Sequence, residues 1–331
     1  MKIPNNFLRK PGRVTLSCFL IFLSTLTCAG EDDLTPQSLI NLMSRATHEL
    51  NYDGIFIYKR GRQMDVMRVL HKNGENGEVE RLVSLNGYQR EVIRNNKTVT
   101  CIFPDNKEVI VEKSHPQALL SAKLSAPVTN VSNNYYFSFA SPDRIAGHDT
   151  YVVVINPKDN YRYGYRLWID MDNHLLMKSE LKNTTGFSLE EIIFTKLDVL
   201  AAIPDELLEP SLQEEGYTWY NSAALNTQDS EGITGWNVNW MPEGFTKTEH
   251  EFHPLATSLS PVDHFVFTDG MAMVSVFIEK IKQRSQILTG PSRIGAVNAF
   301  SRLAGGYQVT VVGEVPQVTV QKMAISVDSS Q

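Results

Sequence analysis

The stretch LWIDMDNHLLMK, residues Leu167 to Lys178, carries two aspartates, an asparagine and a histidine within five residues. All four side chains can bind a cation, so the stretch is either a metal loop or a turn between two strands. A calcium loop of the EF-hand type needs a glycine and a glutamate where this sequence has Leu175 and Leu181. No second histidine lies nearby to complete a transition-metal site. We therefore interpret the stretch as a turn and expect no metal.

The residues on both sides of this turn predict a β-hairpin, because apolar side chains alternate with polar ones before and after it. Register depends on loop length, and only an odd loop aligns the two apolar rows. We therefore expect a five-residue turn, Asp170–His174, with Ile169 opposite Leu175 or Met177. The aspartates favour such a turn because their side chains can bond to their own backbone.

The same alternation extends over most of residues 54–197, where Asn-Gly pairs at 73–74, 76–77 and 86–87 mark tight turns. Helical spacing occurs after Thr35-Pro36, and a short helix is expected over 116–124. The fold class is therefore mainly β (α+β): a long antiparallel meander, one face of which is covered by one or two helices.

The N-terminus has the pattern of a secretory signal, with four basic residues followed by a short apolar segment and the small residues of a cleavage zone. We expect residues 1–30 to be cleaved; an uncleaved anchor is the alternative. Cleavage would take the net charge from −6 to −10, because it removes four basic groups and no acidic one. An acidic exported protein is a poor candidate for nucleic-acid binding, so we expect a soluble exported protein.

Composition predicts two domains. Residues 31–204 contain the meander, and residues 205–234 form an acidic linker rich in proline and serine, partly ordered around Tyr217–Tyr220. Residues 235–328 contain further short strands and a closing helix that begins near Pro316. This second unit is expected to be a smaller α/β domain.

Residue patterns give no support to catalysis. No nucleophile elbow, phosphate-binding loop or dinucleotide motif is present. Cys101, which alone would remain after signal cleavage, lies within the predicted strand TVTCIFP and is interpreted as a structural thiol. We expect neither an enzyme nor a cofactor.

Several segments resemble the RseB/MucB family, and together they cover nearly all of the chain after the signal. The N-terminal segments are LNYDGIFIYKRG (50–61), RLVSLNGYQREVIRNN (81–96), PDRIAGHDTYVVVINPKDNYRYGYRLWIDMDNHLLMKSELKN (142–183) and LEEIIFTKLDV (189–199). The C-terminal ones are WNVNWMPEGF (236–245), FTDGMAMVSVFIE (267–279) and YQVTVVGEVP (307–316).

This resemblance implies a periplasmic protein of Gram-negative bacteria. Its large domain would be an unclosed antiparallel β-barrel with covering helices, similar to the lipoprotein carriers LolA and LolB. It would bind the periplasmic part of a membrane-spanning anti-sigma factor of the RseA/MucA type and shield it from proteolysis. Lipid or lipopolysaccharide would release it, and it would tend to self-associate.

The family does not fix individual contact residues, so the site residues are hypotheses from composition. A curved sheet with few helices can leave an apolar concavity for a lipid tail, for which we single out Ile57, Met67, Phe137 and Phe139. Aromatic residues and a locally basic region suggest a surface for an acidic partner, although a solvated face is the simpler interpretation. Its candidate residues are Trp236, Trp240, Phe245, Lys280, Lys282, Arg284 and Arg293.

Two functions remain open at this point. The first is a regulatory binding protein, and the second is a periplasmic lipid or lipoprotein carrier of the LolA/LolB type. The linked second domain favours the regulator, because a simple carrier needs only the barrel.

Overall fold

The computed structural model describes residues 34–75, 77–113, 131, 133–211, 216–221, 235–254, 261–281 and 288–329. Residues from Thr35 onward belong to one compact unit. The expected signal segment, the helix expected over 116–124, Lys282 and Arg284 lie outside the described residues. In the part of the chain that is described, no helix has the length and apolar character needed to cross a bilayer.

Helix α1 spans Pro36–Glu49 and begins where the sequence predicts it. The Thr35 hydroxyl accepts from the Ser38 backbone N–H at 3.1 Å, and the Ser38 hydroxyl accepts from the Thr35 backbone N–H at 2.9 Å. This reciprocal pair satisfies two N–H groups that the first helical turn leaves unbonded. The helix buries one apolar face, made of Leu39, Ile40, Met43 and Ala46.

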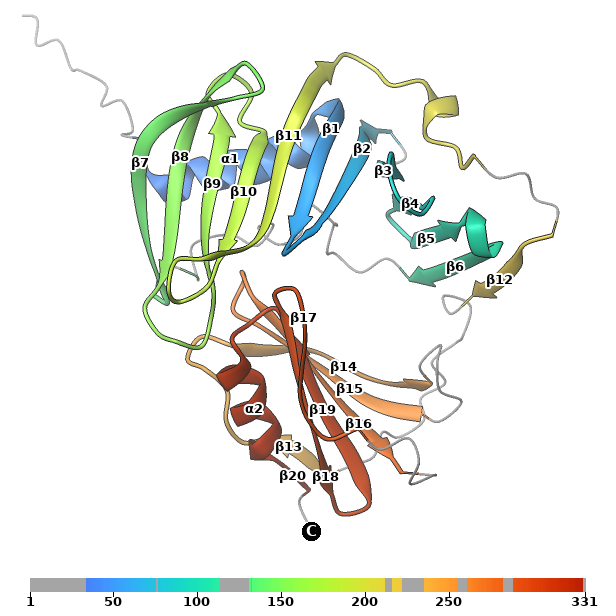
Figure 1. Ribbon diagram of the computed structural model, residues 1–331, viewed down its shortest axis with the longest axis vertical. Helices are drawn as coiled ribbons and strands as arrows, with labels where there is room; N and C mark the ends of the chain where they lie inside the picture. The colour runs from blue at the N-terminus through green and yellow to red at the C-terminus, as the bar shows by residue number, and fades with distance from the viewer. Residues whose placement is uncertain are drawn as a thin grey trace, which may run out of the picture. The chain divides into compact units, whose positions relative to one another are not determined.

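The large sheet has twelve strands in the order β12-β6-β5-β4-β3-β2-β1-β11-β10-β9-β8-β7 (Figure 1). Neighbouring strands are antiparallel except for the parallel pair β12–β6. Within the described residues its end strands β12 and β7 do not pair, so the sheet is unclosed and the expected fold class is confirmed. In chain order the strands are β1 (Asn51–Arg60), β2 (Gln63–Gly74), β3 (Gly77–Ser84), β4 (Glu91–Asn95), β5 (Thr98–Phe103), β6 (Glu108–Lys113), β7 (Tyr135–Ile145), β8 (His148–Pro157), β9 (Gly164–Asp170), β10 (Leu176–Lys182), β11 (Ser188–Leu200) and β12 (Thr218–Asn221). A 3₁₀ turn, η1 (Pro104–Asn106), joins β5 to β6.

The described residues of the segment expected to be a linker include regular structure. It contains the 3₁₀ turn η4 (Asp205–Leu207) and strand β12, which adds to the edge of the large sheet beside β6. All four residues of β12 are exposed, so backbone pairing contributes more to its position than side-chain burial does.

The smaller sheet has six strands in the order β14-β15-β16-β19-β18-β17, and helix α2 (Gln317–Ser326) packs on it through β18 and β19 (Figure 1). Its strands are β14 (Thr246–Pro254), β15 (Pro261–Thr268), β16 (Met273–Lys280), β17 (Gly290–Ile294), β18 (Val297–Ala304) and β19 (Tyr307–Gly313). A separate two-stranded ladder joins β13 (Trp236–Val238) to β20 (Val327–Ser329). The expected closing helix after Pro316 is present, with Pro316 at its N-cap.

The hairpin between β9 and β10 is a turn, as the sequence predicts. One Asp170 carboxylate oxygen accepts from the backbone N–H groups of Asp172 at 2.8 Å and Asn173 at 3.0 Å. His174 has φ 62°, a left-handed conformation that closes the bend. The Asn173 side-chain oxygen accepts from the backbone N–H of Leu175 at 2.8 Å, so the side chains of Asp170 and Asn173 both stabilise the turn.

The predicted register of this hairpin is wrong at its first pair, because Ile169 faces Leu176 instead of Leu175 or Met177. A bulge between Leu176 and Lys178 then shifts the register by one residue. Met177 is fully buried at this bulge. The sequence pattern predicted the apolar rows correctly but gave no sign of the extra residue.

Candidate functional site

The face of the large sheet that α1 covers is traced by cross-strand pairs. Phe56 pairs with Met67 on one side and with Phe194 on the other. Leu167, Val153 and Phe139 lie opposite one another on β9, β8 and β7. Strand β10 pairs with both β11 and β9, and these pairs place the residues around Phe56 and those around Leu167 on the same face. Leu39, Ile40 and Met43 of α1 pack against this face.

Three of the four residues singled out for lipid binding share this face, namely Met67, Phe137 and Phe139. Met67 is buried and Phe137 half-buried, whereas Phe139 is 42% exposed. Ile57 lies on the opposite face, because it is adjacent to Phe56 in an extended strand. The structure therefore removes Ile57 from the proposed concavity.

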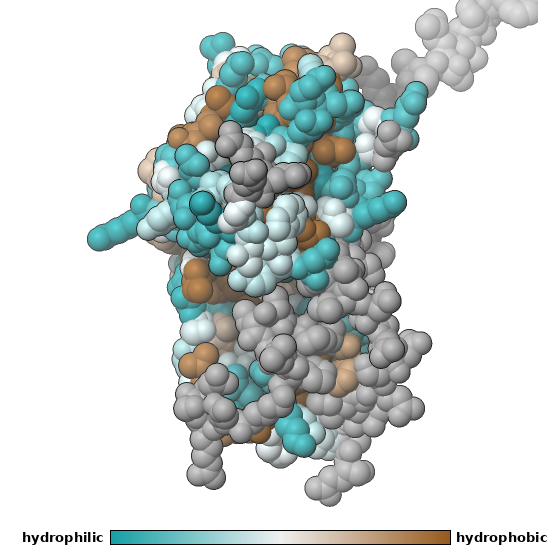
Figure 2. All heavy atoms as spheres, turned by 90° about the vertical axis from the view of Figure 1, so that its right-hand side faces the viewer, coloured by the Kyte–Doolittle hydropathy of each residue, from teal (hydrophilic) through white to brown (hydrophobic). Residues whose placement is uncertain are grey.

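Met67 also lines a cavity of about 470 Å³, which lies at the start of β2 and the ends of β3 and β5. Most of the other residues that line it are polar, so an apolar chain would meet few apolar side chains there. These residues are Gln63, Asp65, Ser84, Asn86, Tyr88, Gln89, Arg90, Phe103, Asp105 and Asn106. On the surface seen in Figure 2, the described hydrophobic residues form small groups among hydrophilic ones. The α1-covered face near Phe137 and Phe139 is thus the better candidate for an apolar ligand.

Two of the residues singled out for partner binding belong to the core of the smaller sheet. Trp236 is 8% and Phe245 5% exposed, and both pack in its main apolar cluster. Rings withdrawn from solvent to this degree cannot form a docking surface without local unfolding. Sequence patterns alone do not separate a core ring from a surface ring, which explains this error.

The remaining described candidates on this sheet are more accessible. Lys280 and Arg293 are exposed, while Trp240 is half-buried and packs edge-on against Tyr161, with ring centroids 5.1 Å apart. The Lys322 ammonium lies over both rings and donates to the Tyr161 hydroxyl at 2.6 Å. Trp240 is therefore held by the loop between β8 and β9 as well as by its own domain.

That loop also carries Arg162, which is fully buried and which the sequence analysis missed. Its guanidinium donates to the Asp269 carboxylate at 2.7 Å and to the Glu243 backbone carbonyl at 2.7 Å. It also pairs with Asp159 of its own loop at 3.0 Å. These bonds join the large sheet to two turns of the smaller one.

Asp269 is satisfied from both sides. One of its oxygens accepts from the Tyr135 hydroxyl at 2.9 Å as well as from Arg162, and the other accepts from the backbone N–H groups of Met271 and Ala272. Burial, reinforced by the Asp269 charge, raises the pKa of Tyr135 well above its ordinary value. Tyr135 therefore remains a hydrogen-bond donor at any physiological pH.

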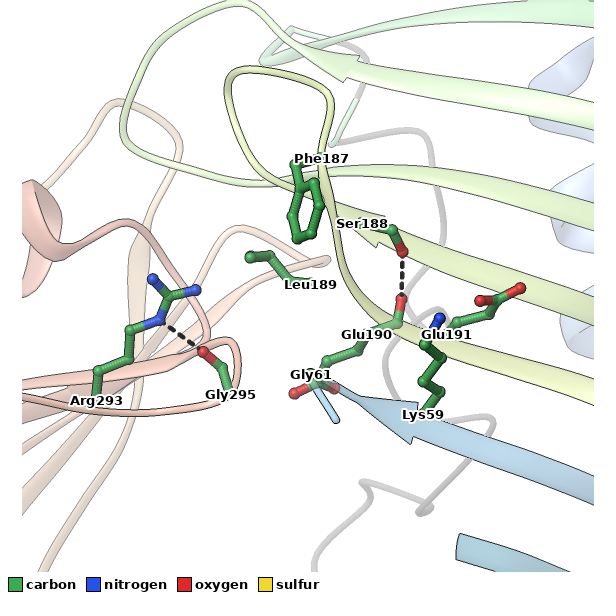
Figure 3. Close-up of a pocket in the computed structure, with 9 residues that line it drawn as sticks. All are labelled: Lys59, Gly61, Phe187, Ser188, Leu189, Glu190, Glu191, Arg293 and Gly295. Atoms are coloured by element: carbon green, nitrogen blue, oxygen red, sulfur yellow. Dashed lines mark hydrogen bonds between the residues drawn. The ribbon is translucent and has the colours of Figure 1, made fainter. Parts of the chain in front are cut away.

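The two sheets also meet around the cavity shown in Figure 3, which has a volume of about 200 Å³ and is lined by residues of both. The end of β1, the start of β11 and the turn between β17 and β18 surround it. Phe187 and Leu189 lie beside Arg293, near the end of β17, and Gly295, in the turn that follows it (Figure 3). The lining is Lys59, Gly61, Phe187, Ser188, Leu189, Glu190, Glu191, Arg293 and Gly295.

Glu190 is the buried carboxylate of this cavity. It accepts from the Tyr58 hydroxyl at 2.8 Å and from the Ala296 backbone N–H at 3.3 Å. Burial first, and the Glu190 charge second, raise the pKa of Tyr58. Gly295 has φ 62°, and a Cβ on it would overlap the Arg60 side chain, so both the backbone conformation and the close approach favour glycine.

None of these arrangements resembles a catalytic site. Cys101 is half-buried in β5, and burial, followed by the charge of Glu112, raises its pKa, which disfavours the nucleophilic thiolate. Among the described residues, no group of three or more His, Cys, Asp or Glu side chains is placed to hold a metal ion. What the described residues do offer is the apolar surface around Phe137 and Phe139.

Comparison with known proteins supports a binding role. Residues 35–212 match the family model of the MucB/RseB N-terminal domain, and residues 230–328 match that of the MucB/RseB C-terminal domain. The "Sigma factor AlgU regulatory protein MucB" of Pseudomonas aeruginosa is 27% identical over 95% of this chain and 97% of its own. The "Sigma-E factor regulatory protein RseB" of Haemophilus influenzae is 26% identical over 95% of this chain and 96% of its own.

Solved structures agree with these sequence matches. The complex of Pseudomonas aeruginosa MucA/MucB contains a chain that is 26% identical, with a TM-score of 0.69, over 89% of this chain and 99% of that one. A crystal structure of MucB gives 25% identity and a TM-score of 0.65, over 89% of this chain and 98% of that one. The similarity therefore covers both sheets and the segment between them.

Proposed function

Because the chain belongs to the MucB/RseB family, we propose that it is a non-enzymatic periplasmic regulator that binds the periplasmic domain of a MucA/RseA-type anti-sigma factor. The observation that carries this proposal is the likeness, over nearly the whole chain, to a MucB whose structure was solved with MucA. The named relatives are likewise regulatory proteins of sigma factors. Bound to the anti-sigma factor, the chain would shield it from proteolysis and so restrain a sigma-E-type stress response.

The signal that releases the complex is proposed to be a lipid or lipopolysaccharide. Half-buried Phe137 and partly exposed Phe139, on the face covered by α1, support an apolar binding site. Phe139 and Tyr151 lie with ring centroids 6.4 Å apart, so the site offers adjoining aromatic surfaces. A ligand can release the partner only if it binds the free form more tightly than the partner-bound form.

The binding experiment is calorimetry of the chain, without residues 1–30, against the periplasmic segment of the anti-sigma factor from the same organism. We expect saturable one-site binding, and a segment of scrambled sequence serves as the control. Limited proteolysis of the segment, with and without the chain, tests shielding. No binding of the native segment would overturn the proposed partner.

Lipopolysaccharide added to the preformed complex tests release. A loss of complex that grows with lipopolysaccharide and not with detergent alone supports the lipid signal. If the complex persists while lipid binds the chain, the signal is a different molecule.

A lipid or lipoprotein carrier is the second candidate, favoured by the exposure of Phe139 on the same face. A pull-down separates the two. Capture of a single-pass anti-sigma factor supports the regulator, whereas capture of lipoproteins alone supports the carrier.

A further inference from the structure

A row of polar side chains crosses the α1-covered face of the large sheet, away from the contact with the smaller sheet. Tyr52 on β1 pairs with His71 on β2, His71 with Glu80 on β3, and Glu80 with Arg94 on β4. Tyr52, His71 and Glu80 are 5%, 2% and 3% exposed. Binding of a protein partner or a lipid does not by itself require this buried polar row.

The row contains more acid than it can pair. Arg94 donates to Glu78 at 3.3 Å, while its Nε atom lies 3.7 Å from the nearer Glu80 oxygen, beyond hydrogen-bond distance. The other Glu80 oxygen and Arg94 Nε are both buried, and among the described residues neither has a hydrogen-bond partner. The Arg94 guanidinium therefore lies between two carboxyl groups. It donates a hydrogen bond to Glu78, whereas its Nε atom is too far from Glu80 to do so.

The environment of Glu80 favours its neutral form. Burial, only partly offset by Arg94 and reinforced by the charge of Glu78, raises the pKa of Glu80 to about 7. Its protonation thus changes near neutral pH, unlike that of an ordinary glutamate, which is ionised above about pH 4.3.

The C-terminal end of α1 is fastened to this row. His48, in the last turn of α1, has its Nδ1 atom 2.9 Å from one Glu78 oxygen. The backbone carbonyl of Leu50, the C-cap of α1, lies 2.8 Å from His71 Nδ1. Since a carbonyl can only accept, His71 carries a proton on Nδ1, and its Nε2 atom faces Glu78 at 3.9 Å.

We propose that this row is a proton-sensitive latch, which holds the end of α1 on the sheet when Glu80 is protonated and loosens when Glu80 is ionised. An ionised Glu80 places a buried negative charge beside the half-buried Glu78 and draws Arg94 away from Glu78. Because Glu78 is also the partner of His48, this change reaches α1 directly. The titratable and charged groups around Glu80 are Tyr52 of β1, His71 of β2, Glu78 of β3 and Arg94 of β4. His48 of α1 contacts Glu78, the neighbour of Glu80 on this face.

The latch goes beyond the proposed function, because it concerns the mobility of the helix over the apolar face and needs no partner. Local opening of α1 would expose Glu80 to water and return its pKa toward the ordinary value. Raising the pH from 6 to 8 should then increase the opening equilibrium by up to about tenfold.

Hydrogen exchange of the whole chain without residues 1–30, followed by mass spectrometry, measures this opening. Peptides that cover residues 44–52 should exchange faster at pH 8 than at pH 6, beyond the intrinsic effect of pH on amide exchange. The Glu80→Gln variant should show no such excess, because it cannot ionise. The matched control is Glu49→Gln, which changes an exposed carboxylate in the same helical turn. Equal excess in wild type and Glu80→Gln, or no excess in wild type, would overturn the latch.

Carboxyl carbon NMR of the unmodified chain keeps the test decisive if Glu80→Gln does not fold. A Glu80 resonance that titrates near pH 7, together with the excess exchange in α1, supports the latch. Titration near pH 4 to 5 overturns it, and so does titration near pH 7 without any excess exchange in α1.

Discussion

The guanidinium of Arg162 lies 2.7 Å from the carboxylate of Asp269, and both side chains are completely withdrawn from solvent. One comes from the loop between β8 and β9, and the other from the turn between β15 and β16. The pair therefore joins the two sheets by a charge contact that water does not screen.

The first prediction concerns this pair. Asp269→Asn removes the negative charge and leaves the buried Arg162 cation with Asp159 as its remaining carboxylate partner. It should therefore lower the free energy of unfolding by an amount toward the lower end of about 3–5 kcal/mol. The midpoint of urea unfolding measures the change. Lys196→Ala is the control, because the Lys196–Asp198 pair is equally close, at 2.7 Å, but exposed. Such exposed pairs contribute little to stability, because solvent and salt screen them. Equal effects of the two substitutions would contradict the role of burial.

The second prediction concerns Gly295, whose φ is 62° and whose missing Cβ leaves room for Arg60. Gly295→Ala should destabilise the protein by about 1–3 kcal/mol, because the backbone is strained and the Arg60 side chain must move. Thermal unfolding provides the measurement. Gly305→Ala is the matched control, since Gly305 has φ 54° but no atom within 4 Å of its added Cβ. If Gly295→Ala loses no more stability than Gly305→Ala, the Arg60 side chain moves aside without an energetic penalty.

The third prediction is a pH dependence that comes from His71. Burial lowers its pKa below the ordinary value of 6.5, so the unfolded chain binds a proton more readily than the folded one. The stabilisation by neutral His71 is therefore fully present above about pH 6.5 and is lost as the pH falls through the lower folded pKa. His71→Gln should not show this loss. Urea unfolding between pH 5 and 7.5 should show the advantage of wild type over the variant shrinking at acidic pH; a constant difference would contradict it.

The fourth prediction separates the two faces of the large sheet. Phe139→Ser should weaken binding of lipopolysaccharide, because Phe139 lies on the α1-covered face and is 42% exposed. Ile57→Ser, on the opposite face, should leave that affinity unchanged. Displacement of a fluorescent lipid reports both affinities. If Ile57→Ser has the larger effect, the lipid binds the outer face instead.

The fifth prediction concerns the basic region of the smaller domain. Reversing Lys280, Lys282 and Arg284 together to glutamate should weaken binding of the anti-sigma segment and reduce the dependence of that affinity on salt. Calorimetry at two ionic strengths measures both quantities. Lys196→Glu on the large sheet is the control for a change in net charge. Unchanged affinity would remove this region from the binding surface.

Local sequence signals predicted the local structure well. Thr35 and Pro36 marked the start of α1, and the aspartates around the β9–β10 turn marked a bend instead of a metal loop. The alternation of apolar residues gave a mainly β chain, because each strand exposes its two faces in turn. Such signals need no information from distant parts of the chain.

Sites that depend on distant residues were not predictable in this way. Arg162 and Asp269 are 107 residues apart. Both lie in segments that resemble the family, but nothing in either segment indicates that the two side chains meet. Ile57 was assigned to the wrong face because it lies within an unbroken apolar run, where alternation cannot be recognised. Trp236 and Phe245 resembled surface rings until their neighbours in the core were known.

The core beneath α1 includes two side chains from the smaller sheet's connections, Met271 and Ala296, which are 8% and 0% exposed. A truncated chain that ends before residue 235 would lack both, and its apolar interior would be open to water at that point. The excised smaller part would in turn present Met271 as a bare hydrophobic protrusion. Expressed separately, each half should therefore be more prone to aggregation than the intact polypeptide. Deletion studies that assign one role to each half must first establish that the fragments remain monodisperse.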